Sequence, residues 1–134
     1  MTAMTLYAWF PGTAGEALPF YQEVFGGELE LHTYEEFGRT DGPADAIAHG
    51  ILAGPVSLYG TDAGPEDRPV DMQGISVAAL GAADPDTLTR WFDALADGGT
   101  VIDPLQPRAW GASDGQVVDR FGLRWLIGFE HDQA

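Results

Sequence analysis

An order of short apolar runs and glycine pairs occurs twice along the chain, and this repetition limits the possible folds more than any other feature. In the first half, an apolar run at 5–10 precedes a helical pattern that ends at the glycines 26–27. In the second half, a run at 74–80 precedes a helical pattern that ends at the glycines 98–99. A strand and a hairpin follow each pair. A repeat of about 70 residues predicts two copies of one βαβββ unit, an α+β fold, and not a solenoid array.

The two helical patterns carry different start signals. Thr13, with Glu16 three residues later, predicts a capping box at the first helix. Pro19 conflicts with a helix that starts there, because it removes an interior hydrogen bond, so we expect a kink or a later start. In the second helix, Asp84 is the expected N-cap and Pro85 the first helical residue.

The remaining segments divide into loops, a linker and a final hairpin. Polar residues at 35–45 and the segment 106–114 indicate loops. We expect a single domain with a first module over about residues 1–62, a linker at about 63–72 and a second module at about 73–134. Two strands joined by a turn that ends at Gly122 form the last hairpin, with Gly122 free to take a positive φ.

Composition limits the location of the protein. The chain has 134 residues, of which 45% are hydrophobic, enough for a core without staples. The absence of cysteine removes disulfides, thiolate nucleophiles and cysteine metal ligands. No apolar run approaches the ~20 residues of a membrane span, and the first residues lack the pattern of a signal peptide. We therefore expect a cytoplasmic protein with no membrane partner.

The formal charge of −15, from 21 acidic and 6 basic residues, limits the possible partners. Such a chain repels a phosphate backbone, so we expect no nucleic acid partner. Two interpretations of the charge stay open. It is either a solvated surface that keeps the protein dispersed, or a field that attracts cationic ligands.

Several short sequences, in a fixed order, resemble PhnB-like proteins of the glyoxalase/bleomycin-resistance/dioxygenase group, the vicinal oxygen chelate superfamily. They are Tyr7-Ala8-Trp9-Phe10-Pro11-Gly12, Glu16-Ala17, Phe20-Tyr21, His49, Trp110-Gly111, Asp119-Arg120-Phe121-Gly122 and Arg124-Trp125. The resemblance implies two βαβββ modules that form curved mixed sheets around a cavity, with the helices outside. It also implies a homodimer, since members cover their open sheet edges with a second copy.

The resemblance also implies where a metal would be bound. Metal-dependent members place His or Glu on the first and last strands of each half. Those positions fall near Leu6, Leu58, Gly74 and Leu126, or, one residue on, at Tyr7, Tyr59, Ile75 and Trp125. Neither set offers a His-plus-carboxylate site. We therefore expect neither the usual metal nor another cofactor.

His49 is the candidate catalytic residue, because it is a polar side chain in an apolar strand and can act as a general base or a ligand donor. A half-buried structural histidine is the competing interpretation. The expected ligand-binding residues are Trp9, His49, Tyr59, Trp110 and Arg124. For Trp110 a lid and simple loop packing are both open, and Arg124 either holds an anion or forms a surface ion pair.

Three functional hypotheses follow, and whether the protein is an enzyme stays open. The first is a protein that binds, or acts without metal on, an unidentified small molecule in the cavity between the modules. The second is a non-catalytic sequestering protein for a cationic antibiotic or drug, which the negative charge favours. The third is a metal-dependent lyase or dioxygenase, which requires that loop residues such as Glu35, Glu36 or Asp45 supply the ligands.

The metal hypothesis gives a direct prediction. We expect purified, untagged and dialysed protein to hold less than one tightly bound divalent ion per chain, because apolar residues occupy the expected ligand positions. Elemental analysis checks this expectation. About one Zn, Ni, Mn or Fe per chain would contradict it.

Overall fold

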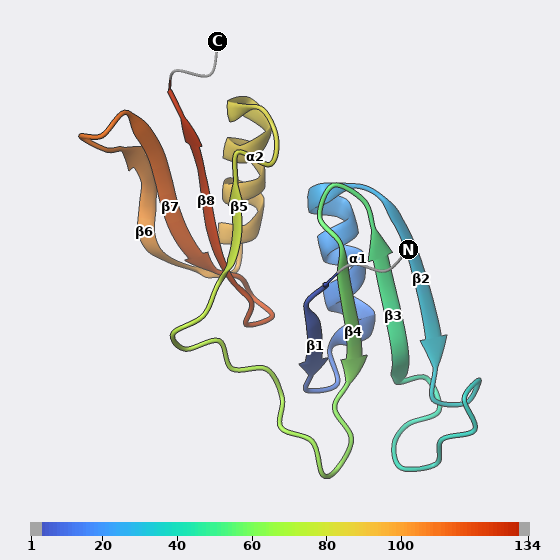
Figure 1. Ribbon diagram of the computed structural model, residues 1–134. Coiled ribbons are helices and arrows are strands. Elements are labelled where there is room, and N and C mark those ends of the chain that lie inside the picture. The colour runs from blue at the N-terminus through green and yellow to red at the C-terminus, as the bar shows by residue number, and fades with distance from the viewer. Residues whose placement is uncertain (1–3, 132–134) are drawn as a thin grey trace. The chain divides into compact units, whose positions relative to one another are not determined.

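The computed structural model describes residues 4–131, which form two compact units with a boundary between Val70 and Asp71. Each unit is a four-stranded mixed sheet with one helix against one of its faces (Figure 1). The α+β class and the helix-covered sheets predicted from the sequence are confirmed. The expected cavity between the two units stays a prediction.

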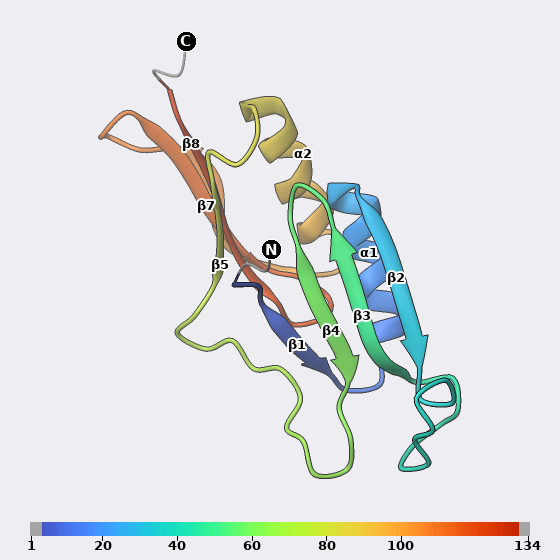
Figure 2. The ribbon, with the colours of Figure 1, turned by 45° about the vertical axis from the view of Figure 1, so that its right-hand side comes forward.

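The first unit has one parallel and two antiparallel strand pairs. Its elements are β1 (Tyr7–Phe10), α1 (Ala14–Phe25), β2 (Glu28–Thr33), β3 (Ile47–Ala53) and β4 (Leu58–Asp62). The strand order is β1-β4-β3-β2, with β1 parallel to β4. Figure 2 shows that α1 covers one face of this sheet, so the opposite face carries no helix of the first unit.

A pair of glycines sets the distance between α1 and the first sheet. Gly50 on β3 and Gly60 on β4 lie opposite each other and face the helix. Leu18 of α1 sits over both, so that a methyl group at either glycine would meet its side chain. Because side chains alternate along a strand, residues next in sequence to these glycines point to the face of the sheet opposite α1, which we call the open face.

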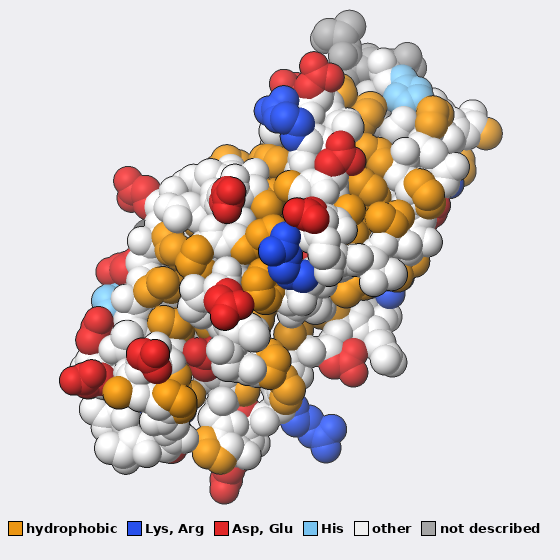
Figure 3. Space-filling model, turned by 180° about the vertical axis from the view of Figure 1, so that it is seen from behind, with side chains coloured by type: hydrophobic (Ala, Val, Ile, Leu, Met, Phe, Trp, Pro, Cys, Tyr) orange, Lys and Arg blue, Asp and Glu red, His pale blue; other side chains and the backbone are white. Residues whose placement is uncertain are grey.

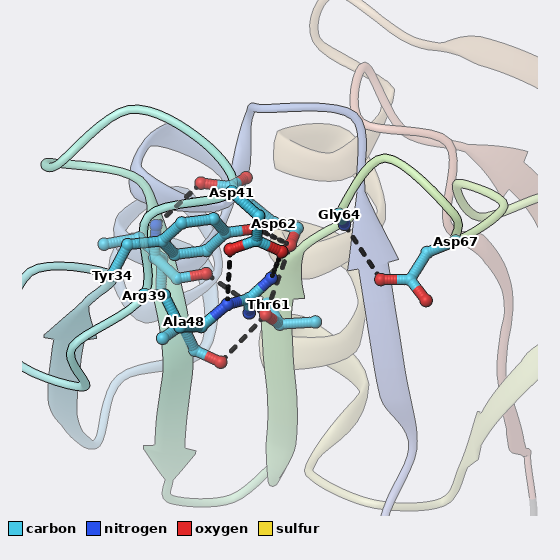
Figure 4. Close-up of polar contacts among 9 residues, drawn as sticks. Tyr34, Arg39, Asp41, Ala48, Thr61, Asp62, Gly64 and Asp67 are labelled. Atoms are coloured by element: carbon cyan, nitrogen blue, oxygen red, sulfur yellow. Dashed lines mark hydrogen bonds and ion pairs between the residues drawn. The ribbon is translucent and has the colours of Figure 1, made fainter.

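A buried aspartate at the end of β4 joins three parts of the first unit. Asp62 is 5% exposed, and its two carboxylate oxygens accept hydrogen bonds of 2.8 Å from the backbone N–H groups of Ala14 and Ile47. The Tyr34 hydroxyl donates to the Asp62 carbonyl at 2.7 Å (Figure 4). The carboxylate therefore satisfies an N–H at the start of α1, which no residue of the helix could satisfy.

Both predictions about the start of α1 need correction. Thr13 makes no side-chain cap, so the predicted capping box with Glu16 is wrong. Asp62 binds the first helical N–H from another strand, a partner that local sequence spacing does not reveal. The later start is also wrong, because the helix begins at Ala14 and continues past Pro19. Tertiary packing of the buried face outweighs the lost hydrogen bond at the proline.

The second unit repeats the topology of the first. Its elements are β5 (Val77–Leu80), α2 (Pro85–Ala96), β6 (Thr100–Pro107), β7 (Ala112–Val118) and β8 (Arg124–Glu130). The strand order is β5-β8-β7-β6, with β5 parallel to β8. This is the order of the first unit with each strand replaced by its counterpart, as the repeat in the sequence predicts.

Two boundaries in the second unit differ from expectation. The strand expected from Gly74 begins at Val77, because Gly74 has a φ of 75° and belongs to a turn. The segment 106–114 is largely strand, and only residues 108–111 connect β6 to β7. The sequence does not predict the full length of β6, because the strand contains Pro104 and Pro107. The strand accommodates them because it lies at the sheet edge and its register shifts twice.

The predicted cap and turn of the second unit are confirmed. Asp84 caps α2 by accepting from the Thr87 N–H at 2.9 Å. Hydrogen bonds with the side chain and then the backbone of Thr87 lower the pKa of Asp84. In the turn between β7 and β8, Gly122 has a φ of 92°. The buried Asp119 accepts from the Leu123 N–H at 3.2 Å and from the Trp125 indole at 2.8 Å, which holds the hairpin closed.

We predict that Asp62→Asn destabilises the protein by roughly 2 to 4 kcal/mol, because an amide accepts from one buried N–H and leaves the other unpaired. Denaturant unfolding measures the loss. The matched control is Asp45→Asn, the same change at an exposed position, which should alter stability by no more than about 0.5 kcal/mol. Equal effects of the two substitutions would contradict the role of Asp62.

Candidate functional site

Four rings gather on the open face of the first sheet, and we call this cluster the aromatic face. It consists of Tyr7 and Trp9 on β1, His49 on β3 and Tyr59 on β4. Tyr7 and Tyr59 are opposite each other in the parallel pair. The ring centroid of Tyr7 lies 4.6 Å from that of Trp9, 5.7 Å from that of His49 and 6.2 Å from that of Tyr59.

Alternation along the strands produces this cluster. In β1 the side chains of Ala8 and Phe10 are buried, while Tyr7 is half-buried and Trp9 is 40% exposed. His49 and Tyr59 are likewise half-buried, next to the glycines that face α1. Rings that stay partly exposed on an otherwise packed sheet can stack on a planar ligand.

A hydrogen bond connects two of the rings. The Tyr7 hydroxyl lies 3.1 Å from Nδ1 of His49. Burial raises the pKa of Tyr7, so its phenol stays protonated at neutral pH and can donate to the ring nitrogen. A neutral His49 in that arrangement carries its proton on Nε2, which has no hydrogen-bond partner among residues 4–131. His49 is therefore oriented by one nitrogen and available through the other.

His32 lies beside this cluster on the edge strand β2, directly opposite His49. Its two ring nitrogens lie 2.9 Å from a Glu36 carboxylate oxygen and 3.2 Å from one of Glu30. The hydrogen bond with Glu36 raises the pKa of His32. Carboxylates thus lie within reach of both ring nitrogens of His32. In His49, by contrast, only Nδ1 has a partner among residues 4–131, and that partner is the Tyr7 hydroxyl.

The second unit contains a pocket of about 690 Å³. Its lining includes Trp110, which is 73% exposed on the connection between β6 and β7, and Phe129. Three carboxylates also contribute to the lining: Asp84, Asp114 and Glu130. Acidic side chains are also spread over the face of the molecule in Figure 3, and not gathered in one patch.

Arg108 and Arg124 in the second unit have different surroundings. Arg108 forms ion pairs of 2.6 Å with Asp103 and 2.8 Å with Asp114, and the pairing raises the pKa of Arg108. Arg124 is half-buried on β8 and donates from Nη2 to the Gln116 side-chain oxygen at 2.7 Å. No carboxylate pairs with Arg124 in the part of the chain that the structure describes.

The predicted ligand residues thus fall into separate groups. Trp9, His49 and Tyr59 come together in the first unit, whereas Trp110 and Arg124 belong to the second. Tyr7 is not among the ligand residues predicted from the sequence. Its alternation with Trp9 along β1 is the signal that could have indicated it. Ligand binding by all of these residues stays a prediction.

A second contact that the sequence does not predict joins Ser113 to His131, the last residue that the structure describes. The Ser113 hydroxyl lies 2.7 Å from Nε2 of His131. Residues 111–115 match the pattern G-x-S-x-G, but Ser113 lies within β7 and not on the sharp strand-to-helix turn of a nucleophile elbow. The contact attaches His131 to the sheet.

The strand registers also show which side chains face away from the helices on the strands where the family resemblance would place metal ligands. Facing away from the helices are Tyr7 and Tyr59 in the first unit, and Ala78 and Leu126 in the second. Leu58 packs in the core instead. Among residues 4–131, no group of three or more His, Cys, Asp or Glu side chains could hold a metal ion. The metal content of the protein stays a prediction.

Comparison with solved structures shows that the fold is an established one. Protein PA1353 from Pseudomonas aeruginosa is 32% identical, with a TM-score of 0.80, and the match covers 97% of this chain and 98% of that one. The PhnB protein from Bacillus cereus has a TM-score of 0.78 at 19% identity, covering 96% of this chain and 99% of that one, a likeness of fold alone.

The sequence matches agree with the fold. The model of the Glyoxalase/Bleomycin resistance protein/Dioxygenase superfamily matches residues 7–127, and the chain therefore belongs to this superfamily. Protein YjdN of Escherichia coli (strain K12) is 26% identical over 141 residues, which cover 95% of each chain. The resemblance seen in the sequence is confirmed. Within residues 4–131, no helix is long and apolar enough to cross a membrane.

We predict that Tyr7→Phe changes the protonation pattern of His49, because the ring stays while the donor to Nδ1 is lost. Long-range ¹H–¹⁵N NMR should show mainly the Nε2–H form in the wild type and a mixture of both neutral forms in the variant. Stability should fall by about 0.5 to 1.5 kcal/mol.

The matched control is Tyr59→Phe. This removes a hydroxyl from a ring centred 5.8 Å from that of His49 without removing the hydrogen bond to Nδ1. The control variant should keep the wild-type pattern of His49. An unchanged His49 in Tyr7→Phe would show that the hydrogen bond does not hold the imidazole in solution.

Proposed function

We propose that this protein binds a planar aromatic small molecule on the aromatic face of its first unit, without a metal ion. The observation that carries the proposal is the hydrogen bond between Tyr7 and His49 within a cluster of partly exposed rings. Rigid aromatic side chains provide contact area at low entropic cost, and a single oriented polar group fixes the direction in which a ligand lies.

The residues have distinct roles in this proposal. Trp9, the more exposed ring, stacks on the ligand, and Tyr59 forms the neighbouring wall. His49 directs Nε2 at a polar atom of the ligand, as a donor when neutral in the arrangement described above. If the ligand reacts, His49 is the group that exchanges a proton with it, since its other nitrogen is already held by Tyr7.

A second candidate function is the sequestering of a cationic small molecule, and the pocket of the second unit favours it. Trp110 and Phe129 line that pocket together with three carboxylates. A cation over an indole ring is stabilised electrostatically, and the net charge of −15 raises the local concentration of cations. This candidate predicts dependence on Trp110 and not on Trp9.

The metal-dependent alternative receives no support from the loop residues proposed to serve it. Glu36 already pairs with His32, and Glu35 and Asp45 belong to no metal-binding group within residues 4–131. The homodimer inferred from the family resemblance remains our proposal for the assembly. The open edges of both sheets are consistent with it, because unpaired edge strands favour association.

The test is a thermal-shift screen of planar aromatic and of cationic small molecules, followed by calorimetric titration of the best hit. Binding raises apparent stability by mass action, so a hit requires no assumed reaction. We expect Trp9→Ala and His49→Ala each to weaken a planar hit about tenfold, or about 1.4 kcal/mol. Their own destabilisation should stay below the 1 to 3 kcal/mol that removal of a core partner costs.

Trp110→Ala is the matched control, since it removes an exposed tryptophan from the second unit. It should destabilise the protein little. Wild-type affinity in Trp110→Ala, with weakened affinity in Trp9→Ala, supports the aromatic face. The reverse result supports the cationic pocket. Unchanged affinity in Trp9→Ala and His49→Ala, together with large losses of stability, would show that these residues are structural.

A further inference from the structure

We propose that Arg124 and Gln116 form a binding site for a small oxyanion, a carboxylate or a phosphate group, on the face of the second sheet that points away from α2. The residues differ from those of the aromatic face and of the pocket beside Trp110. The proposal therefore stands whether or not the proposed function is correct.

The surroundings of the arginines single out Arg124. The six basic residues of the chain are all arginines, against 21 acidic residues. Three of them form ion pairs with aspartates: Arg39, Arg108 and Arg120. Arg68 and Arg90 are exposed to water. Only Arg124, within residues 4–131, is half-buried without a carboxylate partner.

The guanidinium of Arg124 is also incompletely hydrogen-bonded. Its Nε atom is buried and has no partner, the only such buried side-chain nitrogen or oxygen among the described residues. Removing a cation from water without a counter-charge is costly, and proteins normally pair such groups. Arg108, with two aspartates and a similar degree of burial, shows that this unit can pair an arginine fully.

The positions of the two side chains suit an anion. In β8, Trp125 and Ile127 are fully buried, so Arg124 points to the opposite face of the sheet. Gln116 on β7 accepts from Arg124 Nη2 at 2.7 Å, which uses its oxygen and leaves its amide N–H groups outside that bond. Guanidinium and amide N–H groups side by side give charge-assisted and neutral hydrogen bonds to one oxyanion.

NMR of the arginine Nε–H groups tests the proposal on the intact chain. The signal of Arg124 is the one that Arg124→Lys removes. The protein is titrated with sodium phosphate and, separately, with sodium acetate, with ionic strength held constant by sodium chloride. We expect a saturable shift of the Arg124 signal with at least one anion, and the tighter one indicates phosphate or carboxylate. The signals of Arg68 and Arg90 should not saturate. No saturable shift, or equal shifts at all exposed arginines, overturns the proposal.

A charge-neutralising variant provides the second arm. Gln116→Glu places a carboxylate on Arg124 and should weaken the anion about tenfold or more, because the guanidinium is then paired within the chain. Thr89→Glu adds the same charge at an exposed position of α2, and should keep wild-type affinity. Unchanged binding in Gln116→Glu overturns the proposal. Equal weakening in both variants overturns it too, since net charge alone would then explain the effect. Unmoved signals of the other arginines verify that each variant is folded.

Discussion

Each unit of this protein depends on one buried carboxylate that accepts several hydrogen bonds, from distant segments in the first unit and from its own hairpin in the second. Asp62 ties the start of α1 and the start of β3 to the end of β4. Asp119 ties the turn of the last hairpin to the Trp125 indole. A buried charge is tolerated only when donors surround it, so each aspartate requires its neighbours to be in place. In the first unit the start of α1, the start of β3 and the end of β4 are therefore mutually dependent. In the second unit the hairpin turn and the core tryptophan depend on each other.

Once the sheets are fixed in this way, the two units use their open faces differently. The strand orders are the same, but the first face carries rings around His49, while the second carries Arg124, Gln116 and Leu126. The residues that pack against α1 and α2 alternate with these open-face residues along the same strands. A duplicated unit can thus keep one fold and still carry chemically different side chains on its two open faces.

The fold could be predicted from the sequence because its signals are local and occur twice. Hydrophobic spacing gave both helices, the glycine pairs gave their ends, and Asp84 and Gly122 gave a cap and a turn. The long-range partners could not be predicted in this way. The bond from Ala14 to Asp62 spans 48 residues, and the bulges that admit prolines into β6 arise from its edge position. The site residues were only partly predictable, since strand alternation indicates Trp9 and Tyr7 together but not the hydrogen bond to His49.

The glycine pair under Leu18, Gly50 and Gly60, also fixes the register in which β3 and β4 pair. A slip of β3 or β4 by one residue would bring His49 or Tyr59 beneath the helix. Leu18 at Gly50, and Phe10 together with Leu18 at Gly60, already crowd a single methyl group there. Such misaligned pairings are thus excluded sterically. Two residues without side chains therefore determine which side chains face outward, and the chemistry of the open face is specified by atoms that never touch it.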